Sequence, residues 1–596
     1  MKFSGFRSRL RDERFLNFLN RFSFFLSLIA ILVAIYDLGF RHPQYSEEEL
    51  NKFYFIILIT GVATIILRYF LFKIKFRLKV RIFDTLLGSL FFILILVKMD
   101  TLRDNLGFLE SLNKMLYVYL AAFIYFIREF ATVEFNFNRQ NLNPAQLFMA
   151  GFLFIILTGA GLLMLPNATH NGISALDALF TSTSAVCVTG LIVVDTGSYF
   201  TGFGQGVILL LMQLGGLGIM TFASYFSYFF RGQTSYKNQL MLKDATNSEK
   251  IGEVISVLKK ILYITLIVEF LGGIFIYFSL NKSEMALISD RIFFSVFHAV
   301  SGFCNAGFST LENSLYEPGF RHNYTLQMVV ACLFILGGIG FPIVLNLYKY
   351  VVYKLKHGLL RIQKKKERIH LPWMININTR IVIVTTGILL AVGTLGFYAF
   401  EYNNTLAEHS WYGKIVVSFF GAATPRTAGF NSVDTGALNF STLMMIFLLM
   451  WIGASPASTG GGIKTSTIAI ATLNFFSLAR GKDRIEIYKR EISYASVRRA
   501  FAIISLSLMV IGMAVFMIAS FDEDKTLLSI AFECFSAYST VGLSTGITAS
   551  LSAPSKIVLI FTMFIGRVSM LTILIALLRR VKHLNYRYPT DEILIN

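Results

Sequence analysis

The chain has 596 residues, of which 55% are hydrophobic and only 15% are charged. A soluble domain carries about 25% charged residues, so this composition excludes an ordinary soluble protein and indicates a chain embedded in a lipid bilayer. The formal net charge of +19 is compatible with a nucleic-acid partner, but the basic residues cluster in alternate loops between apolar runs, which is typical of membrane topology instead.

Apolar runs of about 20 residues recur along the chain, and each is long enough to cross a bilayer as a helix. No small-residue cleavage site follows the basic start, so we expect no cleavable signal. The alternation of basic loops with acidic or mixed loops predicts a multi-pass protein of the inner (cytoplasmic) cell membrane with both termini in the cytoplasm. We expect twelve spans, near residues 20–40, 53–73, 83–98, 114–128, 145–165, 205–230, 255–280, 325–350, 378–400, 440–478, 500–520 and 556–580.

The first four spans, within residues 1–140, predict an accessory transmembrane bundle. The third of these spans contains Arg81 and Asp84, which is faintly similar to the acidic helix of a voltage sensor. A sensor needs repeated arginines on its fourth helix, and none occurs between Met115 and Ile127. We therefore expect the bundle to serve assembly, lipid contact or regulation rather than voltage sensing.

A glycine signature occurs four times, each time after an apolar segment too short to span the membrane. The glycines are 117, 122 and 113 residues apart, and a near-constant period indicates an internal repeat. We expect pore repeats at residues 141–235, 250–355, 375–480 and 495–596, the last including the C-terminal tail. The four signatures are Val188-Thr189-Gly190, Asn305-Ala306-Gly307, Thr427-Ala428-Gly429 and Thr540-Val541-Gly542.

Each repeat has the order spanning helix, short helix, glycine signature, spanning helix. Glycine permits backbone angles that turn carbonyl oxygens toward an axis, and four such strands can replace the hydration shell of a monovalent cation. The alternative is that these glycines serve close packing of continuous helices. The predicted fold class is an all-α polytopic membrane protein, with four membrane–pore loop–membrane repeats around a pseudo-fourfold pore and an extra four-helix bundle before them.

The second span of the third repeat is interrupted between residues 453 and 466, where a proline precedes Gly460, Gly461 and Gly462. These residues make a continuous helix improbable, and we interpret the stretch as a flexible gate loop below the filter. A phosphate-binding loop is the rival interpretation, but it requires glycine directly before Lys464, where this chain has Ile463.

Ionisable residues within the spans are few. Arg567 lies in the middle of the last span, where an unpaired charge is costly, and a structural ion pair with another helix is one explanation. Arg426 is expected to brace the third filter strand through its several donors. We interpret Asp177, Glu269, His298 and Glu533 as contacts between helices or as anchors of the short helices. The four cysteines, Cys187, Cys304, Cys332 and Cys534, lie in apolar segments and are expected to be free thiols.

From about Asn143 to its end the chain resembles the ion-translocating subunits of the Trk/Ktr/HKT potassium transporter superfamily, of the KtrB/TrkH type. The resemblance rests on the four signatures in this order, on the segment from Ser458 to Thr465, and on the closing Tyr586 to Pro589. It implies that the twelve signature residues bind K⁺ as a selectivity filter. It also implies that the loop with its three glycines and Lys464 gates permeation, with Arg567 facing the pore below the filter as an electrostatic barrier.

The resemblance implies potassium uptake across the cytoplasmic membrane, controlled by the gate loop and by a cytosolic ring of RCK/KTN-type nucleotide-binding regulatory subunits. Gly190 favours potassium, because sodium-favouring relatives have serine at this position. The alternative is a sodium-permeable or Na⁺/K⁺ cotransporting member. A membrane enzyme or receptor would need converging His, Asp, Glu or Cys pairs, which the sequence does not offer, so we expect no enzyme and no covalent cofactor. The expected partners are a second copy in a homodimer, the regulatory subunit and membrane lipids, but no nucleic acid.

Overall fold

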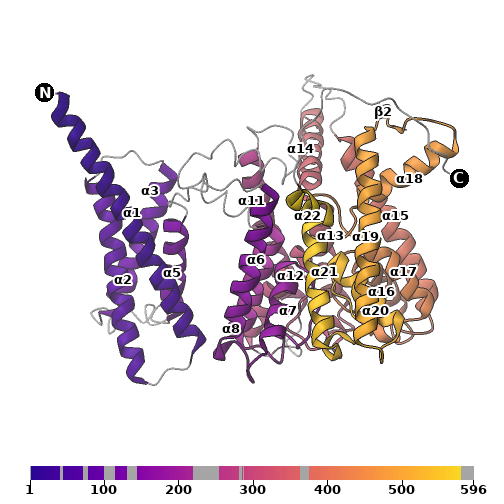
Figure 1. Cartoon of the computed structure of the whole chain (residues 1–596), viewed down its shortest axis with the longest axis horizontal. Helices are drawn as coiled ribbons and strands as arrows, with labels where there is room; N and C mark the ends of the chain where they lie inside the picture. The colour runs from indigo at the N-terminus through magenta and orange to yellow at the C-terminus, as the bar shows by residue number, and fades with distance from the viewer. Residues whose placement is uncertain are drawn as a thin grey trace.

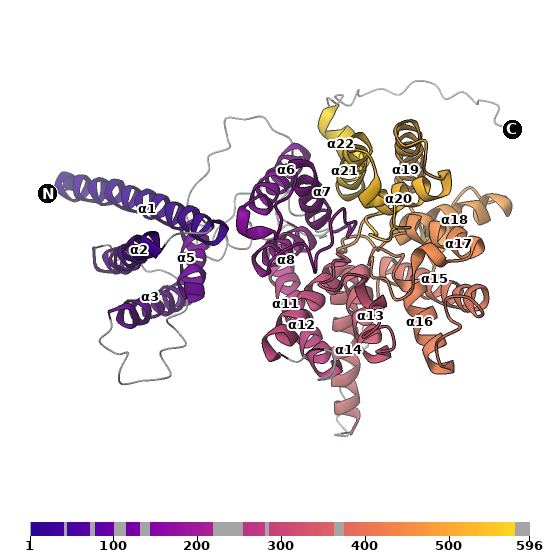
Figure 2. The same cartoon turned by 90° about the horizontal axis from the view of Figure 1, so that it is seen from below.

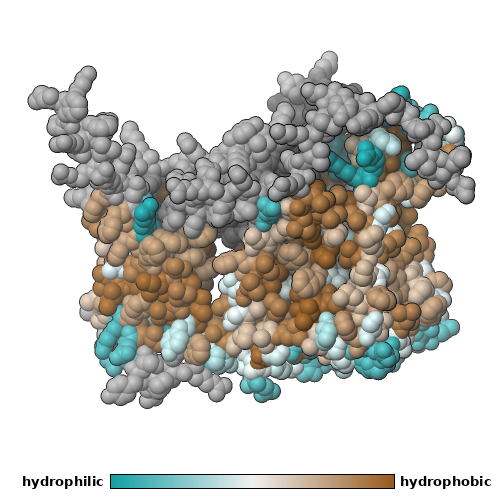
Figure 3. All heavy atoms as spheres, in the orientation of Figure 1, coloured by the Kyte–Doolittle hydropathy of each residue, from teal (hydrophilic) through white to brown (hydrophobic). Residues whose placement is uncertain are grey.

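The computed structural model describes residues 2–40, 44–71, 78–99, 115–130, 144–218, 254–280, 285, 287–362 and 375–578. These residues are mostly α-helical, with 3-10 turns, several non-helical loops and one short hairpin of β1 (Glu486–Ile487) and β2 (Arg490–Glu491). Many large apolar side chains are exposed, and they form a broad hydrophobic band with hydrophilic residues along its lower edge (Figure 3). Such a surface is stable only in contact with lipid, so the chain is a multi-pass membrane protein.

The N-terminal bundle consists of α1 (Lys2–Gly39), α2 (Gln44–Leu71), α3 (Leu78–Lys98) and α5 (Met115–Phe130). It lies to one side of the other helices (Figures 1 and 2). Its core is aromatic, because the rings of Phe91 and Tyr125 meet edge to face at 5.6 Å and Gly61 packs against Phe91. The bundle touches the rest of the protein through the end of α1, where the amide of Asn167 donates to the carbonyl of Leu38 at 3.2 Å.

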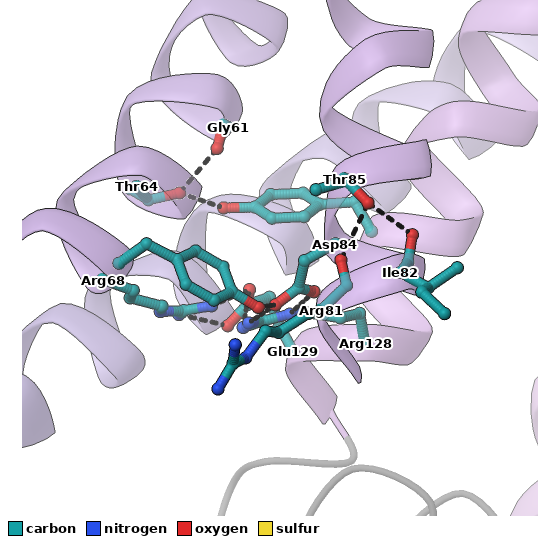
Figure 4. A network of polar contacts seen from close by, with 11 residues as sticks. Gly61, Thr64, Arg68, Arg81, Ile82, Asp84, Thr85, Arg128 and Glu129 are labelled. Carbon is teal, nitrogen blue, oxygen red and sulfur yellow. Dashed lines mark hydrogen bonds and ion pairs between the residues drawn. The ribbon is translucent and has the colours of Figure 1, made fainter. Parts of the chain in front are cut away.

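A buried ionic network joins three helices of this bundle (Figure 4). The guanidinium of Arg68 donates to both carboxylate oxygens of Glu129 at 2.8 and 2.7 Å. Arg128 donates to Asp84 at 3.0 and 3.1 Å and to Glu129 at 2.8 Å. The four side chains are at most 3% exposed. Two arginines balance two carboxylates, which is what makes charge tolerable inside a membrane.

The same network bears on the voltage-sensor comparison. Arg128 and Glu129 are neighbours on α5 and carry opposite charges, so a displacement of α5 would carry no net charge from this pair through the membrane field. The accessory role of the bundle stays a prediction.

The remaining helices form four groups that surround a common centre in chain order (Figure 2). Each group has a first helix, a short helix and a second helix that is interrupted or ends early. The first group is α6 (Pro144–Leu163), α7 (Ala175–Val186) and α8 (Gly202–Leu217), and the second is α11 (Val254–Ser279), α12 (Ile288–Cys304), α13 (Tyr324–Ile339) and α14 (Phe341–Ile362). The third is α15 (Ile377–Glu401), α16 (Trp411–Ala423), α17 (Phe440–Trp451) and α18 (Thr465–Ala479), and the fourth is α19 (Tyr494–Phe521), α20 (Leu527–Ser539), α21 (Ala553–Val568) and α22 (Met570–Leu577).

The short helices α7, α12, α16 and α20 have defined starts. Ser174, Ser410 and Thr526 each accept a hydrogen bond from the backbone amide three residues later, which satisfies an otherwise free helix donor. The second and fourth short helices end at Asn305 and Thr540 in the left-handed conformation, which stops the helix directly at the glycine signature.

The second spans are less continuous than the sequence predicts. The expected span 325–350 is bent by 103° at Gly340, and the expected span 556–580 is bent by 87° at Ser569. Of the expected span 205–230, only residues up to 218 lie within the described part. Because of these breaks, six helices of the described residues are long and apolar enough to cross a membrane, or eight if each bent pair is one span.

The interruption of the third repeat is present but begins and ends slightly earlier than expected. The non-helical stretch covers residues 452–464, between α17 and α18. Residues 465 and 466, which the sequence placed in the loop, already belong to α18. Lys464 is the residue that precedes this helix.

The ionic network makes the bundle sensitive to loss of one charge. Glu129→Gln leaves Arg68 without its bidentate carboxylate, and removal of one partner of a buried pair costs about 3–5 kcal/mol. We expect a lower melting temperature of the purified protein, and partial recovery in the double variant Arg68→Met/Glu129→Gln. Lys52→Gln is the matched control, because its ion pair with Glu48 is exposed on both sides and contributes about 0–1 kcal/mol. Equal melting temperatures for Glu129→Gln and Lys52→Gln would contradict the assigned role.

Candidate ion-permeation site

The four glycine signatures share one backbone conformation. Each filter glycine has a positive φ, at 89° for Gly190, 72° for Gly307, 74° for Gly429 and 92° for Gly542. The residue two positions earlier also has a positive φ, at 57° for Val188, 60° for Asn305, 76° for Thr427 and 51° for Thr540. Side chains are unfavourable in this region, so its occurrence at both matching positions of all four segments indicates a shared structural demand.

The four strands close into a ring. A Cβ atom added to Gly190 would lie 2.3 Å from the carbonyl oxygen of Ala306, in the next strand. The same approach recurs from the second strand to the third, from the third to the fourth, and from the fourth back to the first. The distances are 2.8 Å from Gly307 to Ala428, 2.3 Å from Gly429 to Val541 and 2.3 Å from Gly542 to Thr189. Each glycine therefore packs against a backbone carbonyl of its neighbour, with no room for a side chain.

The strands are held to the short helices behind them by hydroxyl groups. Ser184 and Ser536 accept hydrogen bonds from the amides of Gly190 and Gly542 at 3.0 and 3.1 Å. In the other two repeats the hydroxyls donate instead, Ser301 to the carbonyl of Phe308 at 2.7 Å and Thr424 to that of Phe430 at 2.8 Å. Eleven of the twelve predicted filter residues are buried, and Gly542 is half-buried. The structure thus brings them together in one place.

One side of the ring opens into a cavity of ≈ 400 Å³. The four filter glycines line its base, and residues of the loops that follow them line its walls. The charged residues of this lining are Asp195, Glu312 and Asp434, with no lysine or arginine among them. Acidic walls raise the local concentration of cations, so this side of the ring is suited to collect them.

The predicted gate loop lies against the other side of the ring. Cβ atoms added to Gly460 and Gly461 would lie 2.0 and 2.2 Å from the hydroxyl oxygens of Thr427 and Thr540. The hydroxyl of Thr459 also donates to the side chain of Asn305 at 2.9 Å. The loop therefore contacts three of the four filter strands at their first residues, and its glycines allow that approach.

Lys464 and Arg567 both donate to carbonyl oxygens of this loop. The ammonium of Lys464 lies 2.6 Å from the oxygen of Gly460 and 3.3 Å from that of Gly461. Arg567 donates to the carbonyl of Thr459 and, at the end of α8, to that of Gly215. The ion pair considered as an explanation for Arg567 is not present among the described residues.

Other polar residues have partners that the sequence only partly predicts. Arg426 donates to the carbonyl of Gly453, at the start of the loop, at 3.4 Å, so its recorded contact is with the loop rather than the third filter strand. Asp177 pairs with Lys556 at 2.9 Å, which joins the first short helix to the start of α21. Glu269 accepts from Gln213 at 3.1 Å. Asn305 and Thr459 were not predicted as partners, because no sequence pattern links positions 154 residues apart.

The four cysteines are free, as expected, and no group of three or more metal-ligating side chains occurs within the described residues. A ring of backbone carbonyls in a membrane-embedded helical scaffold, with an acidic cavity on one side, defines a cation-transporting membrane protein.

The comparisons with known proteins place this chain within one family. It belongs to the TrkH family, described as cation transport protein, whose match covers residues 120–585. The chain is 36% identical over 452 residues to Ktr system potassium uptake protein B of Bacillus subtilis, which covers 76% of this chain and 96% of that relative. It is 35% identical over 465 residues to the potassium/sodium uptake protein NtpJ of Enterococcus hirae, covering 77% and 98%. These are transport proteins and not enzymes.

A solved structure shares the fold. The potassium transporter TrkH from Vibrio parahaemolyticus matches with a TM-score of 0.57 over 89% of this chain and 97% of that chain, at 16% sequence identity. The family match begins within α5, so α1, α2 and α3 precede it.

Replacement of a filter glycine tests the ring. Gly190→Ala places a methyl group against the carbonyl of Ala306 and at an unfavourable φ, so we expect loss of cation transport by protein that still reaches the membrane. Gly161→Ala is the matched control, because no atom lies within 4 Å of its added Cβ and alanine favours the helix by about 1 kcal/mol. The measurement is rubidium uptake by equal amounts of reconstituted protein. Normal uptake by Gly190→Ala would contradict the packing described.

Proposed function

We propose that the protein takes up potassium through the ring of four glycine strands. The observation that carries this proposal is the closed cycle in which each glycine packs against a carbonyl of the next strand. Such a ring presents backbone oxygens in place of water around a dehydrated monovalent cation. In this proposal the filter comprises the twelve signature residues, the four repeats have the boundaries expected from the sequence, and K⁺ is the transported ion. The Bacillus subtilis relative is named as a potassium uptake protein, which supports the same ion.

Selectivity between potassium and sodium depends on the size of the ring and on the field strength of its carbonyl dipoles. Glycine at all four positions favours potassium, and Gly190 is the position where serine would be expected in a sodium-favouring protein. The sodium-permeable or cotransporting alternative is favoured by one observation, because the Enterococcus hirae relative is named for uptake of both ions.

The gate in this proposal is the loop between α17 and α18, with Gly460, Gly461 and Gly462 beneath the filter. Its contacts with the hydroxyls of Thr427 and Thr540 support a closed arrangement. Lys464 and Arg567 add two positive charges on the same side of the filter, which opposes the passage of a cation until the loop moves.

The distribution of charge suggests how the protein is oriented in the membrane and where a cytosolic partner docks. The acidic cavity would face outward and the basic segments inward, with both termini in the cytoplasm of a cell bounded by this inner membrane. Exposed basic residues surround the β1–β2 hairpin, including Lys482, Arg484 and Arg490. In this proposal they form the docking surface for a cytosolic nucleotide-binding regulatory subunit of the RCK/KTN type, and the assembly is a homodimer.

Uptake of rubidium and sodium into liposomes under an inside-negative potential tests the proposed ion. We expect rubidium uptake that excess potassium blocks and excess sodium does not, because the ring compensates dehydration best for the larger ion. Comparable sodium uptake would favour the alternative function. Gly190→Ser adds a side chain at the same close contact, so we expect slower total uptake and a higher ratio of sodium to rubidium in the uptake that remains. A wild-type ratio in that remaining uptake would place Gly190 outside the selective part of the path.

Removal of the proposed barrier should raise the rate of uptake. In Arg567→Ala the loop loses the donor to Thr459, and one positive charge leaves the path, so we expect faster rubidium uptake without a regulatory subunit. Deletion of Gly460 to Gly462 should also raise the rate of rubidium uptake. Arg480→Ala, at an exposed position after α18, is the control for loss of a basic residue. Slower uptake by folded Arg567→Ala would contradict the barrier.

A further inference from the structure

The short helices differ at the position nine residues before each filter glycine. This position is occupied by Thr181 in the first repeat, His298 in the second, Phe420 in the third and Glu533 in the fourth. All four side chains are buried behind the filter. Two of them, His298 and Glu533, bind the chain just beyond the glycine of their own repeat, and the other two do not.

Glu533 holds the segment that follows Gly542. One of its carboxylate oxygens accepts from the hydroxyl of Ser544 at 2.6 Å and from the amide of Thr545 at 3.1 Å. The other accepts from the hydroxyl of Thr548 at 2.8 Å. All three contacts use Glu533 as an acceptor, and hydrogen bonds to a carboxylate are stronger than those between neutral groups. The side chain is fully buried, so water does not compete for these bonds.

His298 makes the corresponding contact in the second repeat. One ring nitrogen, Nδ1, lies 2.9 Å from the carbonyl of Phe294, which can only accept, so Nδ1 carries the proton. The other nitrogen, Nε2, therefore accepts from the hydroxyl of Ser309 at 2.9 Å. Ser309 lies two residues beyond Gly307, as Ser544 lies two residues beyond Gly542.

The first and third repeats lack this contact. The hydroxyl of Thr181 has no hydrogen-bond partner within the described residues. Two residues beyond Gly190, where the second and fourth repeats have serine, this repeat has the apolar residue Ile192. In the third repeat Phe420 cannot form a hydrogen bond. The pairs in the second and fourth repeats are therefore diagonally opposite in the ring, whose order is first, second, third, fourth.

The packing of the glycines links the strands that have this contact to the strands that lack it. Gly190 of the first strand packs against Ala306 of the second, and Gly429 of the third strand packs against Val541 of the fourth. Each strand without the contact thus rests on a strand that has it. Gly307 of the second strand and Gly542 of the fourth pack in turn against Ala428 and Thr189, so a displacement of the second or fourth strand affects both of its neighbours.

We propose that His298 and Glu533 are positioning residues that clamp the outer ends of two opposite filter strands, and that Glu533 is thereby a determinant of ion selectivity. The proposal rests on the proposed function of the ring as a cation filter. Loss of a clamp lets the fourth strand move away from its neighbours, so the ring no longer holds the size that excludes the smaller sodium ion.

The test compares three variants in the liposome assay, with the ratio of sodium to rubidium uptake as the readout. Glu533→Leu has similar volume but accepts no hydrogen bond, and we expect the ratio to rise on the order of tenfold, the factor that about 1.4 kcal/mol represents. Glu533→Gln keeps an acceptor for Ser544 and Thr545 and should restore a ratio close to that of the wild type. Thr181→Val is the matched control and should leave the ratio unchanged, because it alters the same position in a repeat without the clamp.

A second measurement separates this proposal from the proposed function. Wild-type uptake alone decides whether the ring passes potassium, whereas the thermal stabilisation of purified protein by potassium relative to sodium reports ring selectivity without flux. Glu533→Leu should lose this difference. If it does not fold, Ser544→Ala removes one of the three bonds and should raise the uptake ratio by a smaller factor. An unchanged ratio and an unchanged stabilisation difference in a folded variant would overturn the proposal.

Discussion

The arrangement of the pore depends on one steric constraint, the approach of each filter glycine to a carbonyl oxygen of the next strand. Because the four approaches form a cycle, a displacement of one strand changes the contacts of both its neighbours. The constraint explains the positive φ angles at the glycines and the close packing of the signature residues. It also explains why a short helix precedes each of the four strands, since each helix must deliver its strand to the same centre. Helical membrane scaffolds tolerate such irregular backbone only where protein encloses it or water lines it, and this ring has short helices behind it and a cavity beyond it.

The features that could be predicted from sequence are those that repeat or that follow from composition. Four glycine signatures at similar spacing indicate the ring without any knowledge of partners, and apolar runs indicate the spans. The interruption before Lys464 was predictable because proline and three glycines oppose a helix. The bends at Gly340 and Ser569 were not predicted, since a single glycine or serine in an apolar run is compatible with a straight helix. The partners of Arg567 could not be predicted either, because they are backbone carbonyls, which every residue has.

The second helices of three repeats share one packing contact, but the residues that follow it differ between repeats. Gly215, Gly337 and Gly566 occupy matching places, since a Cβ on each would lie 2.1, 2.0 or 1.9 Å from a carbonyl near the end of its short helix. The next residue is glycine in the first two repeats but Arg567 in the fourth. The third repeat departs further, because its span opens into the 452–464 loop. These two departures bring Arg567 and the 452–464 loop together beneath the ring that all four repeats form.

Charged side chains within the helical scaffold are accommodated in two different ways in this molecule. In the N-terminal bundle, two arginines meet two carboxylates, and the network is neutral. Beneath the filter, Lys464 and Arg567 instead donate to carbonyl oxygens of the proposed gate loop, so their positive charge is solvated but not neutralised. The same hydrogen bonds that make these charges tolerable at this depth also hold the loop against the filter. Opening the path would therefore require the loop and both cations to separate, and the charge barrier and the steric barrier would be lifted by one movement.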